Sequence, residues 1–159
     1  MGGQILVAED NGNHLIKLCG DVRLTLSISF DRFIDEMFTH EFNSVTFDLR
    51  EAEAVDSTTL GLVAKIALRA QRVGEKPCVV VDNDSIVRVL DVMGFRDILE
   101  IVNGSGLPSA SDASPLPSIS ASEDEMKSKV IEAHKILIAL NQTNAMNFRE
   151  LVESLEHGS

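Results

Sequence analysis

The chain has 159 residues, of which 44% are hydrophobic, enough for one packed domain and an appendage. Its formal net charge is −11, and it contains seven Phe but no Trp or Tyr. This charge repels both a phosphate backbone and an anionic membrane surface, and readers of single-stranded nucleic acid usually combine aromatic rings with basic residues. We therefore expect neither nucleic acid nor a membrane to be the partner.

Metal sites, membrane spans and secretion signals are also disfavoured. Cys19 and Cys78 lie far apart in apolar, strand-like sequence and belong to no zinc-ligand spacing, so we expect buried free thiols and no metal or cofactor. No apolar run approaches the roughly 18 residues of a membrane span. The N-terminus lacks the basic start and apolar block of a signal peptide. The sequence therefore predicts a soluble, cytoplasmic protein.

The first hundred residues predict alternating strands and helices. Strands over 5–8 and 15–18 flank Asn11-Gly12, a strong signal for a tight β-hairpin. Gly74 and Gly94 are placed to end two helices. The hydrophobic spacing predicts a helix over 24–38, a strand over 44–49, a helix over 57–73, a strand over 78–81, a helix over 84–92 and a strand over 99–102. This order predicts an α/β fold in which helices pack on a mixed β-sheet.

The composition changes at residue 104. From 104 to 122, twelve of nineteen residues are Gly, Pro or Ser, which predicts a flexible linker over 104–121 after a domain at 1–103. Ser122 and Glu125 then form a capping-box pattern, and two amphipathic segments separated by a polar break at 141–144 predict a C-terminal helical tail over 122–157. The tail could dock on its own domain, form a homodimer with a second copy, or serve as an arm for a partner.

Ser57 is the candidate modification site. Asp56 is a good N-cap, so Ser57 falls at the first helical position, at the rim of the sheet. The unpaired amides of the first turn and the positive end of the helix would tolerate a phosphate there. On the pattern alone, Asp-Ser-Thr before an apolar helix is more often a simple cap.

Three segments of the chain resemble a known family. Val45-Thr46-Phe47-Asp48-Leu49, a short acidic loop and then Asp56-Ser57-Thr58-Thr59-Leu60-Gly61 resemble the motif of STAS domains, the family of the bacterial anti-sigma-factor antagonists. The usual form of that motif is an apolar strand with Asp, followed by D-S-[S/T]-G-L-G. The segment over 89–95 is similar to the family's later helix-and-glycine segment, and the segment over 99–101 to its closing strand. The resemblance covers about residues 4–102 and implies a STAS-like mixed sheet with packed helices.

The resemblance also implies a role for Ser57, which matches the family's phosphoacceptor, while Asp48 and Asp56 match its acidic positions. In that family the unmodified domain binds an anti-sigma factor, often a serine kinase with a histidine-kinase-like ATPase fold. Phosphorylation of the serine releases this partner, and a metal-dependent serine phosphatase resets the switch. Two positions depart from the pattern, because Thr59 replaces the motif's middle glycine and Arg23 replaces an acid in the family's early Gly-Glu-Leu-Asp.

The candidate partner-binding residues follow from this motif and from the helix that begins at Ser57. They are Asp21, Arg23, Asp56, Thr58, Thr59, Leu62 and Lys65. On that helix we expect an exposed face that carries Thr58, Leu62, Lys65, Arg69 and Arg72. This face is either a solvated basic row or a strip that contacts the partner, with Leu62 as its apolar contact. On the second reading, Leu62→Asp weakens partner binding and leaves the fold intact.

Three other functions are alternatives to a phosphorylation switch. A phosphoaspartate receiver would use Asp48 as acceptor, but Asn11-Gly12 turns the chain back into a strand where a receiver needs a helix, and Lys76-Pro77 precedes a strand instead of following the last one. An enzyme is not expected, because there is no phosphate-binding loop and no histidine has a catalytic partner at motif spacing; each histidine is expected on the surface. A constitutive STAS-type module for a protein or small ligand, with Ser57 only a cap, remains the alternative.

Overall fold

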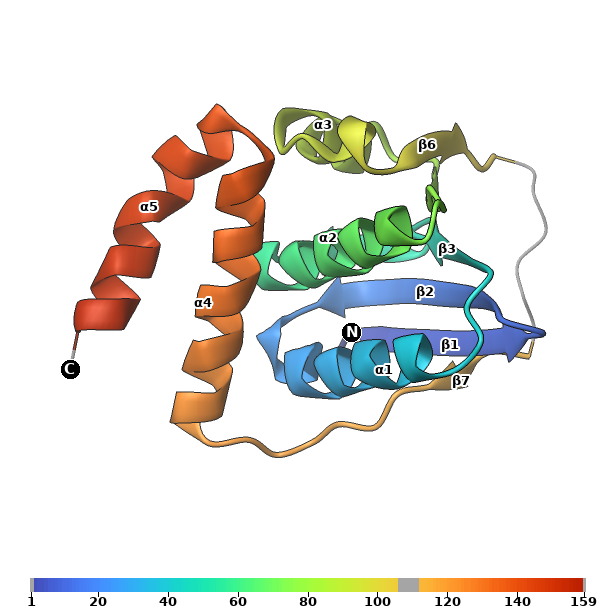
Figure 1. Cartoon of the computed structure of the whole chain (residues 1–159), viewed down its shortest axis with the longest axis horizontal. Coiled ribbons are helices and arrows are strands. Elements are labelled where there is room, and N and C mark those ends of the chain that lie inside the picture. The colour runs from blue at the N-terminus through green and yellow to red at the C-terminus, as the bar shows by residue number, and fades with distance from the viewer. Residues whose placement is uncertain (1, 106–111, 159) are drawn as a thin grey trace.

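The computed structural model describes residues 2–105 and 112–158, and these residues form a seven-stranded mixed sheet with helices packed on it (Figure 1). The strand order across the sheet is β6-β5-β3-β2-β1-β7, and β4 pairs with β2 outside this row. The strands are β1 (Gln4–Asp10), β2 (Asn13–Val22), β3 (Ser44–Asp48), β4 (Ala52–Val55), β5 (Cys78–Val81), β6 (Glu100–Asn103) and β7 (Ser114–Pro115).

The hairpin and the parallel strands form as predicted. β1 and β2 are antiparallel and are joined by Asn11 and Gly12, whose φ values of 53° and 82° are the left-handed pair that a tight hairpin turn requires. β2, β3, β5 and β6 run parallel to one another. A parallel connection needs a crossover, and here the crossovers are helical.

Two helices from these crossovers pack side by side on one face of the sheet (Figure 1). A short 3₁₀ turn, η1 (Leu24–Leu26), leads into α1 (Ser27–Thr39), and α2 is Ser57–Arg72. Phe30 of α1, Ile66 of α2 and Phe47 of β3 have no exposed surface and lie in one continuous core. α3 (Asp84–Val92) and the 3₁₀ turn η2 (Phe95–Asp97) precede β6, and Gly94 separates them with a φ of 86°.

The C-terminal tail forms two helices that dock on the same chain. α4 (Glu123–Leu140) crosses the N-terminal half of α2, and α5 (Gln142–His157) packs against α4 (Figure 1). Leu137 of α4 has no exposed surface and belongs to the domain's core. The predicted capping box is present, with the Ser122 side chain bonded to the Glu125 amide and the Glu125 side chain to the Ser122 amide. Of the arrangements that the sequence left open, the structure shows docking on the tail's own domain.

The structure differs from the sequence-based expectations at several elements. The acidic loop after β3 contains β4, which is a strand because it pairs with β2. β7 lies in the range predicted as linker and pairs with the edge strand β1, and 106–111 of that range lie outside the described residues. Cys19 and Cys78 are free, and both are half-buried. None of the helices in the described part of the chain is long and apolar enough to cross a bilayer.

Two histidines are buried, which corrects the expectation of four surface histidines. His14 is 9% exposed in β2, and His134 is 2% exposed in α4. Aromatic rings account for both positions, since His14 stacks on Phe42 and His134 meets Phe148 edge-on. These ring contacts come from other elements and carry no signal at a fixed sequence spacing.

Candidate functional site

Ser57 is the first residue of α2, as predicted. Asp56 has extended backbone angles, and its Oδ1 accepts a hydrogen bond of 2.8 Å from the amide of Thr59, so Asp56 is the N-cap. The amide of Asp56 donates to the carbonyl of Val22 over 3.2 Å, which ties the start of α2 to the end of β2. The backbone therefore fixes Ser57 at the edge of the sheet.

Asp21 and Arg23 lie at the same edge because they flank Val22 at the end of β2. Arg23 Nε donates to Asp21 Oδ2 over 2.7 Å, and this hydrogen bond lowers the pKa of Asp21 and raises the pKa of Arg23. The negative charge of Asp56 raises the pKa of Arg23 by a smaller amount, which shows an electrostatic attraction between Asp56 and Arg23. We call the group Asp21, Arg23, Asp56 and Ser57 the Ser57 edge. Arg23, where the family has an acid, therefore pairs with Asp21 of the strand that precedes it.

Asp48, the other acidic position of the motif, is in a different setting at the end of β3. Its carboxylate accepts hydrogen bonds from Arg50 Nε at 3.0 Å and Nη2 at 2.8 Å, and Arg50 Nη1 reaches the Gly104 carbonyl at 3.0 Å. Burial raises the pKa of Asp48, but the hydrogen bonds from Arg50 outweigh this effect, and the pKa lies below its ordinary range. Asp48 is thus a charged anchor for the segment between β3 and β4.

The Ser57 hydroxyl is bonded to a histidine of the tail. Ser57 Oγ lies 2.7 Å from His134 Nε2, and His134 Nδ1 lies 2.7 Å from the carbonyl oxygen of Val130. Because a carbonyl can only accept, Nδ1 carries a hydrogen, and in the neutral ring Nε2 then accepts the Ser57 proton. Sequence reasoning missed this contact, although His134 follows Val130 by four residues and therefore borders the apolar seam of its helix.

The tail also covers the face of α2 that was expected to be exposed. Thr58 is 5% exposed and Leu62 has no exposed surface. The expectation of an exposed strip is therefore wrong for these two residues, which are buried on the helix that α4 crosses at Gly61 and Lys65. Leu62→Asp would place a carboxylate in this packed layer and would not leave the fold intact. Farther along α2, Arg69 is half-buried and Arg72 is exposed.

Thr59, which replaces the motif's middle glycine, is also buried, with 1% of its surface exposed. Its hydroxyl has no hydrogen-bond partner among the described residues. The Thr59 amide is occupied by the Asp56 cap, so this residue contributes its backbone to the start of α2 and its methyl group to the core. A direct contact between the Thr59 side chain and a partner would require α2 to be uncovered.

Lys65 takes part in a cluster of charges that joins three helices. Its Nζ lies 2.7 Å from Asp31 Oδ1 of α1 and 3.1 Å from Glu132 Oε1 of α4, and Lys129 of α4 pairs with Asp31 Oδ2. Burial raises the pKa of Asp31, but the hydrogen bonds from Lys129 and Lys65 outweigh it and hold the pKa below its ordinary range. Burial alone would lower the pKa of Lys65. The hydrogen bonds to Asp31 and Glu132 outweigh this effect, so the pKa of Lys65 lies above its ordinary value. We call Asp31, Lys65, Lys129 and Glu132 the charge cluster.

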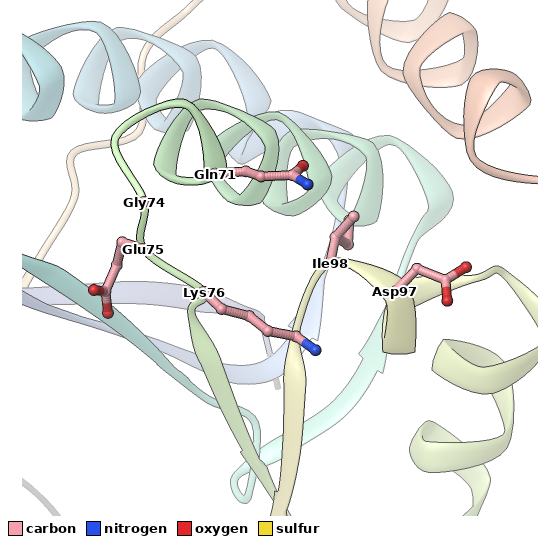
Figure 2. A pocket seen from close by; sticks show the side chains of 6 residues that line it. All are labelled: Gln71, Gly74, Glu75, Lys76, Asp97 and Ile98. Atoms are coloured by element: carbon pink, nitrogen blue, oxygen red, sulfur yellow. The ribbon is translucent and has the colours of Figure 1, made fainter.

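A cavity of about 230 Å³ lies at the end of α2 farthest from Ser57 and is lined by Gln71, Gly74, Glu75, Lys76, Asp97 and Ile98 (Figure 2). It contains none of the predicted site residues. Among residues 2–105 and 112–158, no group of three His, Cys, Asp or Glu side chains is placed to hold a metal ion.

The comparisons with known proteins identify the fold. No protein-family model matches the chain, and no curated protein sequence matches it. Among solved structures the chain is similar to the crystal structure of a "putative anti-sigma factor antagonist" from Thermotoga maritima. The TM-score is 0.53 at 18% sequence identity, and the match covers 60% of this chain and 82% of that chain. The fold is therefore STAS-like, with α4 and α5 as a C-terminal helical extension.

Proposed function

We propose that this protein is a phosphorylation-switched anti-sigma-factor antagonist. In the unmodified state it binds an anti-sigma factor, or a serine kinase with a histidine-kinase-like ATPase fold, and phosphorylation of Ser57 releases this partner. A metal-dependent serine phosphatase returns the protein to the binding state. The observation that carries the proposal is the place of Ser57, the first residue of α2, at one edge with Asp21, Arg23 and Asp56 in a STAS-like fold.

The physical basis of the switch is charge. A phosphoserine adds about −1.5 to −2 charges at pH 7, next to the carboxylate of Asp56. A charge left buried and unpaired in an interface costs roughly 3–5 kcal/mol, which corresponds to an affinity loss on the order of a hundredfold to a few thousandfold. One phosphate on Ser57 is therefore sufficient to release a partner that packs over it.

The proposed cycle consumes ATP, because the kinase transfers a phosphoryl group from ATP to Ser57. Since this cycle needs the kinase and ATP in the same compartment as the protein, we propose a cytoplasmic location. Arg23 is exposed and Asp21 and Asp56 are half-buried, so the rim of the Ser57 edge is open to a partner. Nucleic acid and membranes have no part in this cycle. Of the four other candidate contacts, Thr58, Thr59 and Leu62 are buried, and Lys65 is paired with Glu132 of α4.

One observation favours a second function, a constitutive binding module. The hydrogen bond between Ser57 and His134 gives the serine a structural role that needs no phosphate. In such a module, Ser57 would hold the tail in place and the partner would bind irrespective of modification. Phosphate on Ser57 in the cell distinguishes the two functions.

The test is site mapping of the protein isolated from its own cells. Three proteins are captured with their partners: wild type, Ser57→Ala and the control Ser85→Ala, which alters an exposed serine of α3. The mass of each intact protein is measured, and the phosphorylated residue is mapped. We expect one phosphate on Ser57 in wild type and Ser85→Ala, none in Ser57→Ala, and a kinase-like partner retained by Ser57→Ala. An unmodified Ser57 under varied growth conditions would instead support the constitutive module.

A further inference from the structure

The tail contacts the modification site in this structure, where Ser57 is half-buried. The Ser57 hydroxyl and the His134 ring are at hydrogen-bonding distance, 2.7 Å, and the ring is buried between α2 and Phe148 of α5. No space remains between Ser57 Oγ and His134 Nε2 for a phosphorus atom and its oxygens. A kinase acting on Ser57 must reach the same oxygen that His134 now contacts.

The tail is fitted closely to α2 at Gly61. A Cβ atom on Gly61 would lie 2.5 Å from the carbonyl oxygen of Ala133 and 2.6 Å from its Cβ, both in α4. Only glycine permits this approach, even though glycine in a helix interior costs about 0.5–1 kcal/mol relative to alanine. The small residues at this crossing allow α4 to lie directly on the first half of α2.

Polar contacts at both ends of α4 complete the docking. Near its start, the charge cluster joins α4 to α1 and α2. Near its end, Asn144 Nδ2 donates to the carbonyls of Met93 and Leu137, each at 2.8 Å, and Asn141 Nδ2 donates to the carbonyl of Val92 at 3.0 Å. The tail is therefore held against α1 and α2 by the charge cluster, against α2 at Gly61, and against the end of α3 at Val92 and Met93.

We propose that α4 and α5 are an intramolecular cover of the Ser57 site, and that phosphorylation of Ser57 requires α4 to leave and then keeps it away. The ester oxygen of phosphoserine has no proton to donate to His134, so the present hydrogen bond is lost. The phosphate also brings negative charge beside the Asp56 carboxylate and into the space that the imidazole fills. Both effects favour the open arrangement.

On the proposed function, the cover also determines whether the partner can reach its binding surface on α2. α4 contacts Lys65 through Glu132, and two further candidate partner contacts on the same helix, Thr58 and Leu62, are buried in this arrangement. A partner that uses them has to displace α4, so it would present a helix with a small residue over Gly61 and a cation toward Asp31, as Ala133 and Lys129 do. The tail is then a competitor for the partner within the same chain.

Hydrogen exchange on the full-length protein tests the cover without any partner. The variants are Ser57→Glu, which brings charge to the site, and Gly61→Ala, which leaves Ser57 intact but places a methyl group against Ala133. Gln71→Ala, at an exposed position of α2, is the matched control. We expect amide exchange over 123–140 to be about tenfold faster or more in the first two variants. Exchange in β3 and β5 should stay slow, which shows that the domain remains folded.

Unchanged or slower exchange over 123–140 in Ser57→Glu, with a folded domain, would overturn the proposal, because charge at Ser57 would then be compatible with a docked tail. Gly61→Ala and Gln71→Ala, which both keep Ser57, are also expressed in the protein's own cells, and their intact masses report the phosphate on Ser57. If Gly61→Ala opens the tail, we expect a higher phosphorylated fraction than in Gln71→Ala, and an equal fraction would overturn the proposal. Absence of phosphate in every variant contradicts the proposed function alone. In that case, the rate of amide exchange over 123–140 in Ser57→Glu still tests whether the tail covers Ser57.

Discussion

At the scale of single residues, His14 shows how packing fixes a protonation state. Its ring lies 5.8 Å from the Phe42 ring in a stacked arrangement and 6.5 Å from the Phe33 ring edge-on. Neither ring nitrogen has a hydrogen-bond partner among the described residues. Burial lowers the pKa of His14, and the charge of Glu9 opposes this effect only partly. The folded protein therefore holds His14 neutral.

This burial predicts a pH dependence of stability. Because the folded-state pKa is below the unfolded value of about 6.5, the unfolded chain binds more protons between the two values. Stability from neutral His14 is complete above about pH 6.5 and decreases as the pH falls through this window. Urea unfolding at about pH 8 and about pH 5 should show a smaller loss in His14→Phe than in wild type. An equal loss in both proteins would mean that His14 does not contribute.

Thr59 is a buried residue whose hydroxyl has no hydrogen-bond partner among the described residues. A buried hydroxyl without a partner costs about 1–3 kcal/mol, and valine has the same shape without that hydroxyl. We expect Thr59→Val to raise the free energy of unfolding by about 1 kcal/mol, measured by urea denaturation. The matched control is Thr59→Ser, which keeps the hydroxyl, loses the methyl group and should be less stable than wild type. A destabilised Thr59→Val would show that the hydroxyl has a role of its own.

At the scale of elements, local signals predicted what depends on local chemistry. The hairpin at Asn11-Gly12, the start of α2 after Asp56 and the helix end at Gly74 each follow from residues within one turn. β4 could not be predicted, because it becomes a strand only through its pairing with β2. The burial of Leu62 could not be predicted either, because it depends on how elements far apart in the sequence pack into one core. The same reason explains why His134 was missed as the partner of Ser57.

The charge cluster links three of these elements, and one substitution tests it. Asp31→Asn removes the more buried of the two carboxylates that pair with both Lys65 and Lys129, since the Asp31 side chain is 7% exposed and the Glu132 side chain 40%. We expect a loss of about 2 kcal/mol of unfolding free energy, less than the 3–5 kcal/mol of a fully buried pair. Asp35→Asn is the control, since its pair with Arg69 is exposed and should change stability by less than about 1 kcal/mol. Equal effects of the two substitutions would show that the cluster does not hold α4.

At the scale of the whole molecule, the chain is a STAS-like sheet with packed helices, and α4 and α5 lie across one end of α1 and α2 (Figure 1). The sequence predicted the fold of the first part, and it predicted that the tail is helical, because each rests on periodicity and caps. It left the place of the tail open, because an amphipathic seam fits many surfaces. The structure places the tail on α2, so the same surface carries the candidate modification site and its cover.

The measurement that tests the central claim most directly is the affinity of the captured regulator for two forms of the full-length protein. One form is unmodified, and the other carries a single phosphate on Ser57, with both checked by intact mass. We expect the phosphorylated form to bind more weakly by roughly a hundredfold or more, because a charge at the start of α2 would be buried in the interface. Equal dissociation constants for the two forms would contradict the account.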